Sequence, residues 1–140
     1  MKIFTLITFG LLLAACSGPV AENPLLFQEA WVRAMPPGSM MTAGFGRLVN
    51  ITGAELEITG YTSPQFDDVS LHQTVLEDGV SRMNEVPALN IPAGAEIKLA
   101  PGGYHLMFMK PVQTYTDMVE LHIEISGGRQ FSFELPVERR

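Results

Sequence analysis

The amino-acid sequence predicts an all-β domain, a sandwich or barrel of about nine short strands with Greek-key links. Short, β-prone segments recur along the chain and are separated by Gly, Pro, Asn or Asp. Segments 119–126 and 131–135 alternate apolar and polar residues, as half-buried strands do. No window repeats apolar residues at the helical spacing over three turns, so we expect little helix.

The chain begins with a segment that resembles a bacterial lipoprotein signal peptide. Lys2 precedes an apolar run from Ile3, and small residues precede Cys16. A charged start, an apolar middle and a small-residue end are features of a secretory signal. Residues 13–16, Leu-Ala-Ala-Cys, resemble a lipobox, in which cleavage precedes a cysteine that is then acylated. An ordinary signal peptide with an incidental cysteine is the alternative.

This interpretation divides the chain into a signal peptide (1–15), a lipidated Cys16 with a tether (16–25) and a folded domain (26–140). The tether is expected because its residues are small, polar and proline-bearing. The residue after the cysteine is Ser17 and not Asp. By resemblance to enterobacterial lipoprotein sorting, this favours the outer membrane. We therefore expect a lipid anchor on the periplasmic side of the bacterial envelope, in the outer membrane rather than the inner.

The strands are expected in this order along the chain: 26–34, 42–50, 54–62, 69–77, 80–86, 95–100, 104–109, 119–126 and 129–137. Turn signals follow many of them: MPPGS after the first strand, NITGA after the second, EDG after the fourth, IPAG after the fifth, APGG after the sixth and SGG after the eighth. The Asp78-Gly79 pair accommodates the positive φ angles of a tight turn, so segments 69–77 and 80–86 should form a hairpin.

Charge and cysteine content exclude several classes of function. Without Lys2, eight basic side chains remain against fifteen acidic ones, and no basic stripe suits a nucleic acid. Cys16 is the single cysteine, which excludes an intramolecular disulfide and a Cys-rich metal site. No phosphate-binding loop or nucleophile-base motif is present, so we expect a protein that is not an enzyme.

Two histidines and two methionines on three of the expected strands form a candidate metal site. His105 and Met107 are two residues apart and leave the same face of a strand, while Leu106 and Phe108 face the core. His72 and Met83 lie in the hairpin segments, and all four side chains converge if these strands are neighbours. Soft, neutral thioethers with imidazoles suit Cu(I), whereas Zn²⁺ favours Cys, His or carboxylate ligands. The alternative is ordinary core methionines and surface histidines.

The spacing His72-x10-Met83-x21-His105-x-Met107 resembles the signature of the periplasmic copper chaperone family of PCuAC type at all four positions. Residues 30–38 (AWVRAMPPG) and 99–109 (LAPGGYHLMFM) are similar to two other segments of that family. The resemblance implies a cupredoxin-like fold that binds Cu(I) through these four side chains. It also implies delivery to the dinuclear copper centre of cytochrome c oxidase subunit II, alongside Sco-type thiol proteins.

The sequence departs from this family in two places. Gln73 stands where many members have a methionine, and the chain ends in ELPVERR, without the His- and Met-rich tail that can take Cu(II). A copper-storage or buffering lipoprotein and a metal-free β-sandwich envelope protein remain alternatives. Copper-mediated electron transfer is disfavoured because blue-copper sites need a cysteine thiolate.

The remaining methionines are less clearly placed. One of Met40 and Met41 is expected in the core and the other is incidental; the alternative is that they lie near the site and help to hand copper over. Met118 is expected in the core. Met109 shares a face with His105 and Met107, and spacing alone does not say whether it contacts a metal. Because delivery requires ligand exchange with a partner, we expect the four candidate ligands near the surface.

Overall fold

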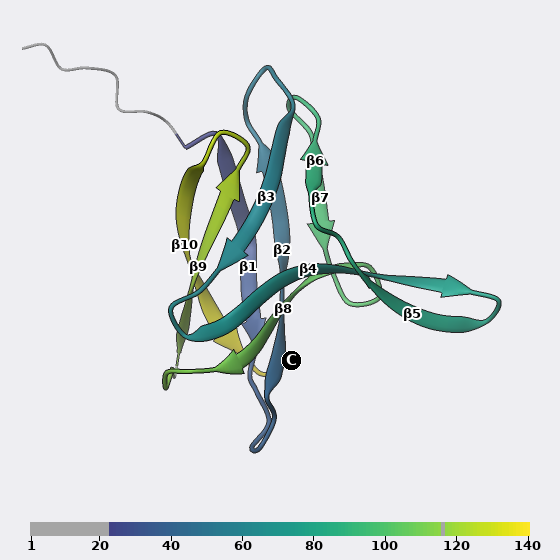
Figure 1. The fold of residues 1–140 in the computed structure, drawn as a ribbon, viewed down its shortest axis with the longest axis vertical. Helices are drawn as coiled ribbons and strands as arrows, with labels where there is room; N and C mark the ends of the chain where they lie inside the picture. Colours follow the sequence, from purple (N-terminus) through teal and green to yellow (C-terminus); the bar gives the residue numbers. More distant parts are fainter. Residues whose placement is uncertain (1–22, 116) are drawn as a thin grey trace, which may run out of the picture.

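The fold is described from a computed structural model that covers residues 23–115 and 117–140, and these form ten strands and no helix (Figure 1). The strands are β1 (Leu25–Arg33), β2 (Met41–Asn50), β3 (Leu56–Thr62), β4 (Phe66–Glu77), β5 (Val80–Glu85), β6 (Leu89–Ile91), β7 (Glu96–Leu99), β8 (Tyr104–Pro111), β9 (Met118–Ile125) and β10 (Arg129–Glu138). The expected signal peptide, Cys16 and tether residues 16–22 lie outside the described residues. Within the described ranges, no helix has the length and hydrophobicity of a membrane span.

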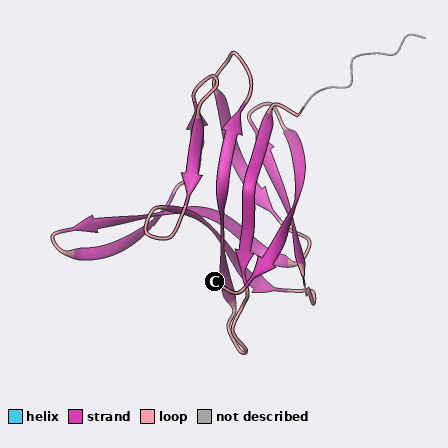
Figure 2. Ribbon diagram, turned by 180° about the vertical axis from the view of Figure 1, so that it is seen from behind, coloured by secondary structure: helices cyan, strands magenta, loops and turns pink. Residues whose placement is uncertain are grey.

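The strands follow one hydrogen-bonded order, β5-β4-β8-β7-β2-β1-β10-β9-β3-β6, which folds into two facing layers (Figures 1 and 2). Strand β10 joins the layers: Arg129 to Pro136 pair with β9, whereas Val137 and Glu138 pair with β1. Alternate side chains point between the layers and form a single core. The fully buried residues of one layer include Leu25, Val32, Leu48, Leu106 and Phe108, and those of the other include Ile58, Leu121, Ile123 and Leu135. The predicted all-β sandwich is confirmed.

One strand was not expected from the sequence. β6 is only three residues long and is flanked by Pro87 and Pro92, so its pattern is too short to read as a strand. It pairs with β3 because Leu89 and Ile91 are buried in the core. The prolines therefore delimit this strand without preventing it.

The first strand begins at Leu25, one residue before the expected start of the domain at 26. Leu25 is fully buried and pairs with Asn50 of β2. Its backbone N–H donates a 3.0 Å hydrogen bond to the Asn23 side chain. The last residues before the domain are thus attached to it by both burial and hydrogen bonding.

The hairpin predicted around Asp78 and Gly79 is present, and both turn residues have positive φ angles of 51° and 78°. Strand β4 also pairs with β8, from Phe66 opposite Pro111 to Gln73 opposite Tyr104. Beyond Gln73, β4 pairs with β5 alone among the described strands, and this two-stranded ribbon extends away from the sandwich (Figure 1). The ribbon and β8 together position the candidate metal ligands.

Candidate metal centre

The antiparallel pairing of β4 with β8 brings the two candidate histidines together. His72 lies directly opposite His105, so both side chains leave the same face of the sheet. Their rings are roughly parallel, with centroids 6.1 Å apart and an interplanar angle of 28°. On β8, Leu106 and Phe108 point the other way and are fully buried, as the sequence predicts.

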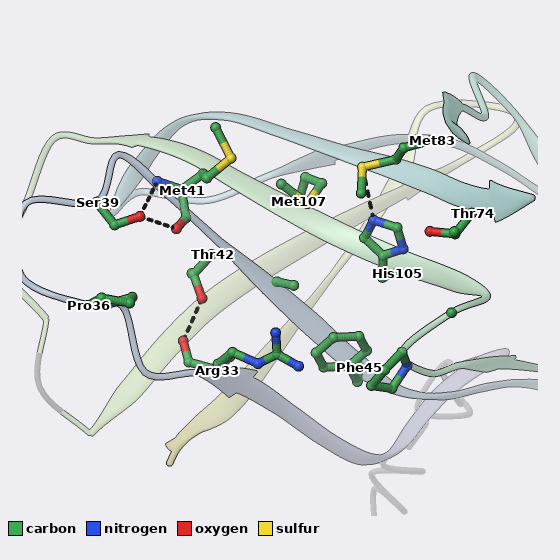
Figure 3. Close-up of a pocket in the computed structure, with 13 residues that line it drawn as sticks. Arg33, Pro36, Ser39, Met41, Thr42, Phe45, Thr74, Met83, His105 and Met107 are labelled. Carbon is green, nitrogen blue, oxygen red and sulfur yellow. Dashed lines mark hydrogen bonds between the residues drawn. The ribbon is translucent and has the colours of Figure 1, made fainter. Parts of the chain in front are cut away.

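The hairpin brings Met83 to the same face. Met83 of β5 lies opposite Thr74, and Thr74 is two residues from His72 on β4. Because side chains two residues apart leave the same side of a strand, Met83 projects over the histidine pair. The Met83 sulfur lies 3.4 Å from Nε2 of His105 (Figure 3).

The surroundings of His105 determine the tautomer of its neutral ring. Its Nδ1 lies 3.0 Å from the backbone carbonyl oxygen of Gly103, and since a carbonyl only accepts, Nδ1 carries the proton and donates it. In the neutral ring Nε2 then holds a free lone pair, which faces the Met83 sulfur. A backbone carbonyl on the second ring nitrogen is a common way of orienting a metal-binding histidine.

The distance between the two atoms fits two ligands of one ion. For tetrahedral ligands at about 2.0 Å (nitrogen) and about 2.3 Å (sulfur), the donor atoms are separated by about 3.5 Å. The 3.4 Å between His105 Nε2 and Met83 Sδ is close to that separation. With the proton on Nδ1, the contact drawn as a dashed line in Figure 3 joins two lone pairs, and a cation between them would satisfy both.

The ring of His72 has one satisfied and one unsatisfied nitrogen. Its Nε2 lies 2.9 Å from Oγ of Ser70, and its Nδ1 is buried without a hydrogen-bond partner. A buried polar atom without a partner carries a desolvation cost of about 1–3 kcal/mol. The Ser70 hydroxyl can donate or accept, so the hydrogen bonds of His72 leave open which of its nitrogens carries the proton.

Met107 completes the set and lies between Ser70 of β4 and Ala43 of β2. Together with Met83 and His105 it lines an open cavity of about 430 Å³ (Figure 3). His72 is not among the residues that line this cavity and lies beside His105 at its edge. The structure therefore brings three of the four candidates around one cavity, with the fourth adjacent.

The expected position near the surface holds for some ligands more than for others. Met83 is 53% exposed, whereas His105 is only 5% exposed. His72 and Met107 are half-buried. The centre thus has a buried imidazole at its base and an exposed thioether on the ribbon.

The donor types select the kind of ion. Among the described residues, no three His, Cys, Asp or Glu side chains are grouped closely enough to hold a metal. A hard cation therefore lacks the oxygen ligands that it prefers, and Zn²⁺ would find only the two imidazoles among its usual ligands. Two imidazoles with two thioethers instead match a soft ion such as Cu(I).

Met41 also lines the cavity, which agrees with the alternative that the sequence left open for Met40 and Met41. The expectation that one of Met40 and Met41 packs in the core is wrong, because they are 59% and 51% exposed. Thr42 and Gly44 occupy the inward positions of β2, so Met41 faces outward. Met41 is identified as a cavity residue by its position opposite Met109. That position depends on the pairing of β2 with β8, which the sequence does not give.

Met118 is likewise misplaced by the sequence prediction. It is 42% exposed and not part of the core. Val119 is the first inward residue of β9 and is fully buried, so its neighbour Met118 points outward.

Comparison with known proteins begins with sequence. The family model described as "Putative lipoprotein LpqE-like" matches residues 25–137. A curated relative, "Putative lipoprotein Lxx21020" of Leifsonia xyli subsp. xyli (strain CTCB07), is 42% identical over 113 residues, which is 79% of this chain and 67% of the relative.

Solved structures with the same fold include the copper-bound PCuAC domain from PmoF2. It superposes with a TM-score of 0.69 at 18% identity, over 84% of this chain and 95% of that domain. The solution structure of CuI-DR1885 from Deinococcus radiodurans has a TM-score of 0.68 at 26% identity, over 91% of this chain and 87% of that one. These likenesses confirm the resemblance to PCuAC-type domains and the cupredoxin-like fold that it implies.

Proposed function

The chain belongs to the LpqE-like lipoprotein family, and from that premise we propose that it is a lipid-anchored copper chaperone that binds Cu(I) outside the cytoplasm. Its ligands in this proposal are His72, Met83, His105 and Met107, and Cys16 carries the lipid. The proposal includes no enzymatic step, because transfer of an ion between ligands changes no covalent bond of the protein.

One observation carries the proposal: Nε2 of His105 and the sulfur of Met83 face each other across 3.4 Å. The two residues are 22 positions apart and come from different strands. No packing requirement places a free imidazole lone pair against a thioether. The position of His72 directly opposite His105, with ring centroids 6.1 Å apart, gives further support.

The oxidation state follows from the donors. Thioether sulfur is soft and neutral and favours Cu(I) over Cu(II). Outside the cytoplasm, paired cysteines tend to oxidise to a disulfide, whereas methionine and histidine donors remain available. The DR1885 structure is that of its Cu(I) form, which supports the same oxidation state here.

Delivery proceeds by stepwise ligand exchange. Met83 is half-exposed on a ribbon outside the sandwich and is the first ligand that an incoming thiolate or thioether can replace. The buried His105 holds the ion until the last step. The PCuAC resemblance supports the dinuclear copper centre of cytochrome c oxidase subunit II as acceptor, with Sco-type thiol proteins as partners. Anchoring in the outer membrane leaves the domain on the periplasmic side.

The test is Cu(I) transfer from the loaded protein to the apo copper-binding domain of an oxidase subunit II under anaerobic conditions. We expect transfer, and we expect a variant with all four ligands replaced to bind Cu(I) at least about 100-fold more weakly in a chelator competition. Tight binding without transfer would indicate storage or buffering instead. Unchanged affinity in the four-ligand variant would refute the assigned site, and absence of binding by the unmodified protein would favour a metal-free envelope function.

A further inference from the structure

Three methionines lie next to one another on the outward face of the sheet, beside the candidate centre. Met41 of β2 is directly opposite Met109 of β8, and Met107 is two residues from Met109 on the same strand. Paired residues and residues two apart share one face, so the three side chains project in the same direction. In Figure 3, Met107 lies between Met41 and Met83.

Sheet geometry brings the three sulfur atoms within reach of one ion. Opposite residues have Cβ atoms about 4.5–5.5 Å apart, and diagonal neighbours are about 7–8 Å apart. The Met41–Met109 pair is of the first kind, and the Met41–Met107 pair is of the second. A methionine side chain has three rotatable bonds and can span these separations.

Packing does not account for Met41. Its side chain is 51% exposed, where a strand would more commonly carry Thr or a charged residue. Its backbone is nevertheless held firmly: the carbonyl accepts a 2.9 Å hydrogen bond from Ser39 Oγ. The backbone N–H of Lys110 also donates to the carbonyl of Met40 at 2.8 Å. Met41 therefore has a flexible, exposed side chain on a backbone that hydrogen bonds hold in place.

The charges on this face also suit a cation. Asp68 of β4 lies opposite Met109 on its other side, so a carboxylate borders the three sulfurs. Arg33 lines the same cavity as Met41 and Met107, and its guanidinium carbon lies over the Phe45 ring, 5.3 Å from the ring centroid. A carboxylate near the sulfurs favours a bound cation.

We propose that Met41, Met107 and Met109 form a second soft-metal site, which takes Cu(I) or Ag(I) through thioethers alone and shares Met107 with the His/Met centre. An ion passes between the two sites when Met41 and Met109 replace His72, Met83 and His105 in steps, with Met107 bound throughout. Neutral donors replace neutral donors, so the step moves no proton and no electron. Its role in loading or release rests on the proposed chaperone function, but the site itself does not.

The first experiment isolates the new site. Ag(I) is titrated into full-length protein carrying His72→Gln, Met83→Leu and His105→Gln, with the methionine methyl groups labelled by ¹³C for NMR. We expect the methyl signals of Met41, Met107 and Met109 to shift and that of Met118 to remain. Adding Met41→Leu should weaken Ag(I) binding about tenfold or more, and adding Met118→Leu should not change it. Unshifted signals, or equal binding with and without Met41, overturn the proposal.

The second experiment uses the otherwise unmodified protein, which avoids any folding defect of the triple variant. Met41→Leu should slow Cu(I) transfer to a chelator about tenfold, whereas Met118→Leu should leave the transfer rate unchanged. An unchanged transfer rate for Met41→Leu overturns the shared-ligand path. If the unmodified protein binds Cu(I) while the triple variant binds no Ag(I), only this inference fails. If the triple variant binds Ag(I) and the unmodified protein transfers nothing to the oxidase domain, only the chaperone function fails.

Discussion

At the scale of single residues, the candidate centre depends on what each ring nitrogen contacts. The Gly103 carbonyl accepts from Nδ1 of His105 and leaves Nε2 directed at Met83. Ser70 contacts Nε2 of His72, and Nδ1 of that ring has no partner. One histidine is thus oriented for binding by the backbone, and the other has an unsatisfied atom that a ligand can satisfy.

Met83→Leu separates binding from stability. The side chain is 53% exposed, so its replacement should change the free energy of unfolding by less than about 0.5 kcal/mol. Loss of one thioether should weaken Cu(I) binding about tenfold or more, measured by competition with a Cu(I) chelator. Met118→Leu is the matched control, since Met118 is 42% exposed on β9 and away from the cavity. Equal Cu(I) affinity in the two variants would exclude Met83 as a ligand.

Tyr61→Phe tests a buried hydroxyl in the core. Burial raises the pKa of Tyr61 above its ordinary value, and its hydroxyl has no hydrogen-bond partner. The folded state therefore disfavours the phenolate, and the stability present below about pH 10 is lost as the pH rises further. Urea unfolding should show this alkaline loss in the unmodified protein and a smaller loss in Tyr61→Phe. At neutral pH the variant should be at least as stable, and a clear destabilisation there would indicate a hydrogen bond that the structure lacks.

At the scale of elements, the ribbon formed by β5 and the end of β4 is the least supported part of the described chain. Every residue of β5 is exposed, and the strand pairs with β4 alone among the described strands. Two-stranded ribbons are marginally stable in water by themselves. Met83 is therefore held over His105 mainly by the Asp78-Gly79 turn and the register of the hairpin.

Gly79→Ala should weaken metal binding without touching a ligand. Gly79 has a φ of +78° with no atom near its Cβ position, so an alanine adds backbone strain of about 1–2 kcal/mol and no clash. The strain should loosen the ribbon and lower Cu(I) affinity severalfold. Gly94→Ala is the control, because Gly94 has a φ of +67° and equally open surroundings in the turn before β7. The idea fails if chelator competition shows the same loss of affinity for both variants.

At the scale of the whole molecule, the two layers are connected at the end of the sandwich where β2, β3 and β6 meet (Figure 1). The fully buried Asn50 donates to the carbonyls of Ala54, Ile91 and Pro92 at 2.7–3.1 Å. Its side-chain oxygen accepts from the backbone N–H and the hydroxyl of Thr52. One amide therefore joins the β2–β3 loop to the chain around β6.

Asn50→Ala should destabilise the fold by about 2–4 kcal/mol, because it leaves buried carbonyls without donors. The measurement is the free energy of unfolding in urea. Asn90→Ala, at an exposed position of β6, should stay within about 0.5 kcal/mol. Cu(I) affinity of the folded Asn50→Ala protein should be unchanged, since β8 pairs with Met41 to Gly44, at the other end of β2 from Asn50. If the fully folded Asn50→Ala protein bound Cu(I) with a different affinity, the expected independence of Asn50 and the metal centre would be contradicted.

Much of the candidate site follows from local patterns. The two-residue period puts His105 and Met107 on one face of β8, with Leu106 and Phe108 in the core. The Asp78-Gly79 turn predicts the hairpin that carries Met83. Two predictions fail: the strand β6 is missed, and Met118 at the start of β9 is expected in the core but is exposed. Both segments are short or terminal and show too few alternations to indicate which side faces the core.

The sequence by itself determined the strand character of the chain and the face on which each ligand lies, because these depend on neighbours a few residues away. It also determined the spacing that resembles a copper-binding family, because that spacing is read directly along the chain. Only the tertiary structure decided that β4 and β2 flank β8, which sets His72 beside His105 and Met41 beside Met109. Those pairings join segments far apart in the chain and depend on how the whole core is filled. The adjacency of the methionines is therefore a property of the folded sheet, which no local pattern of residues contains.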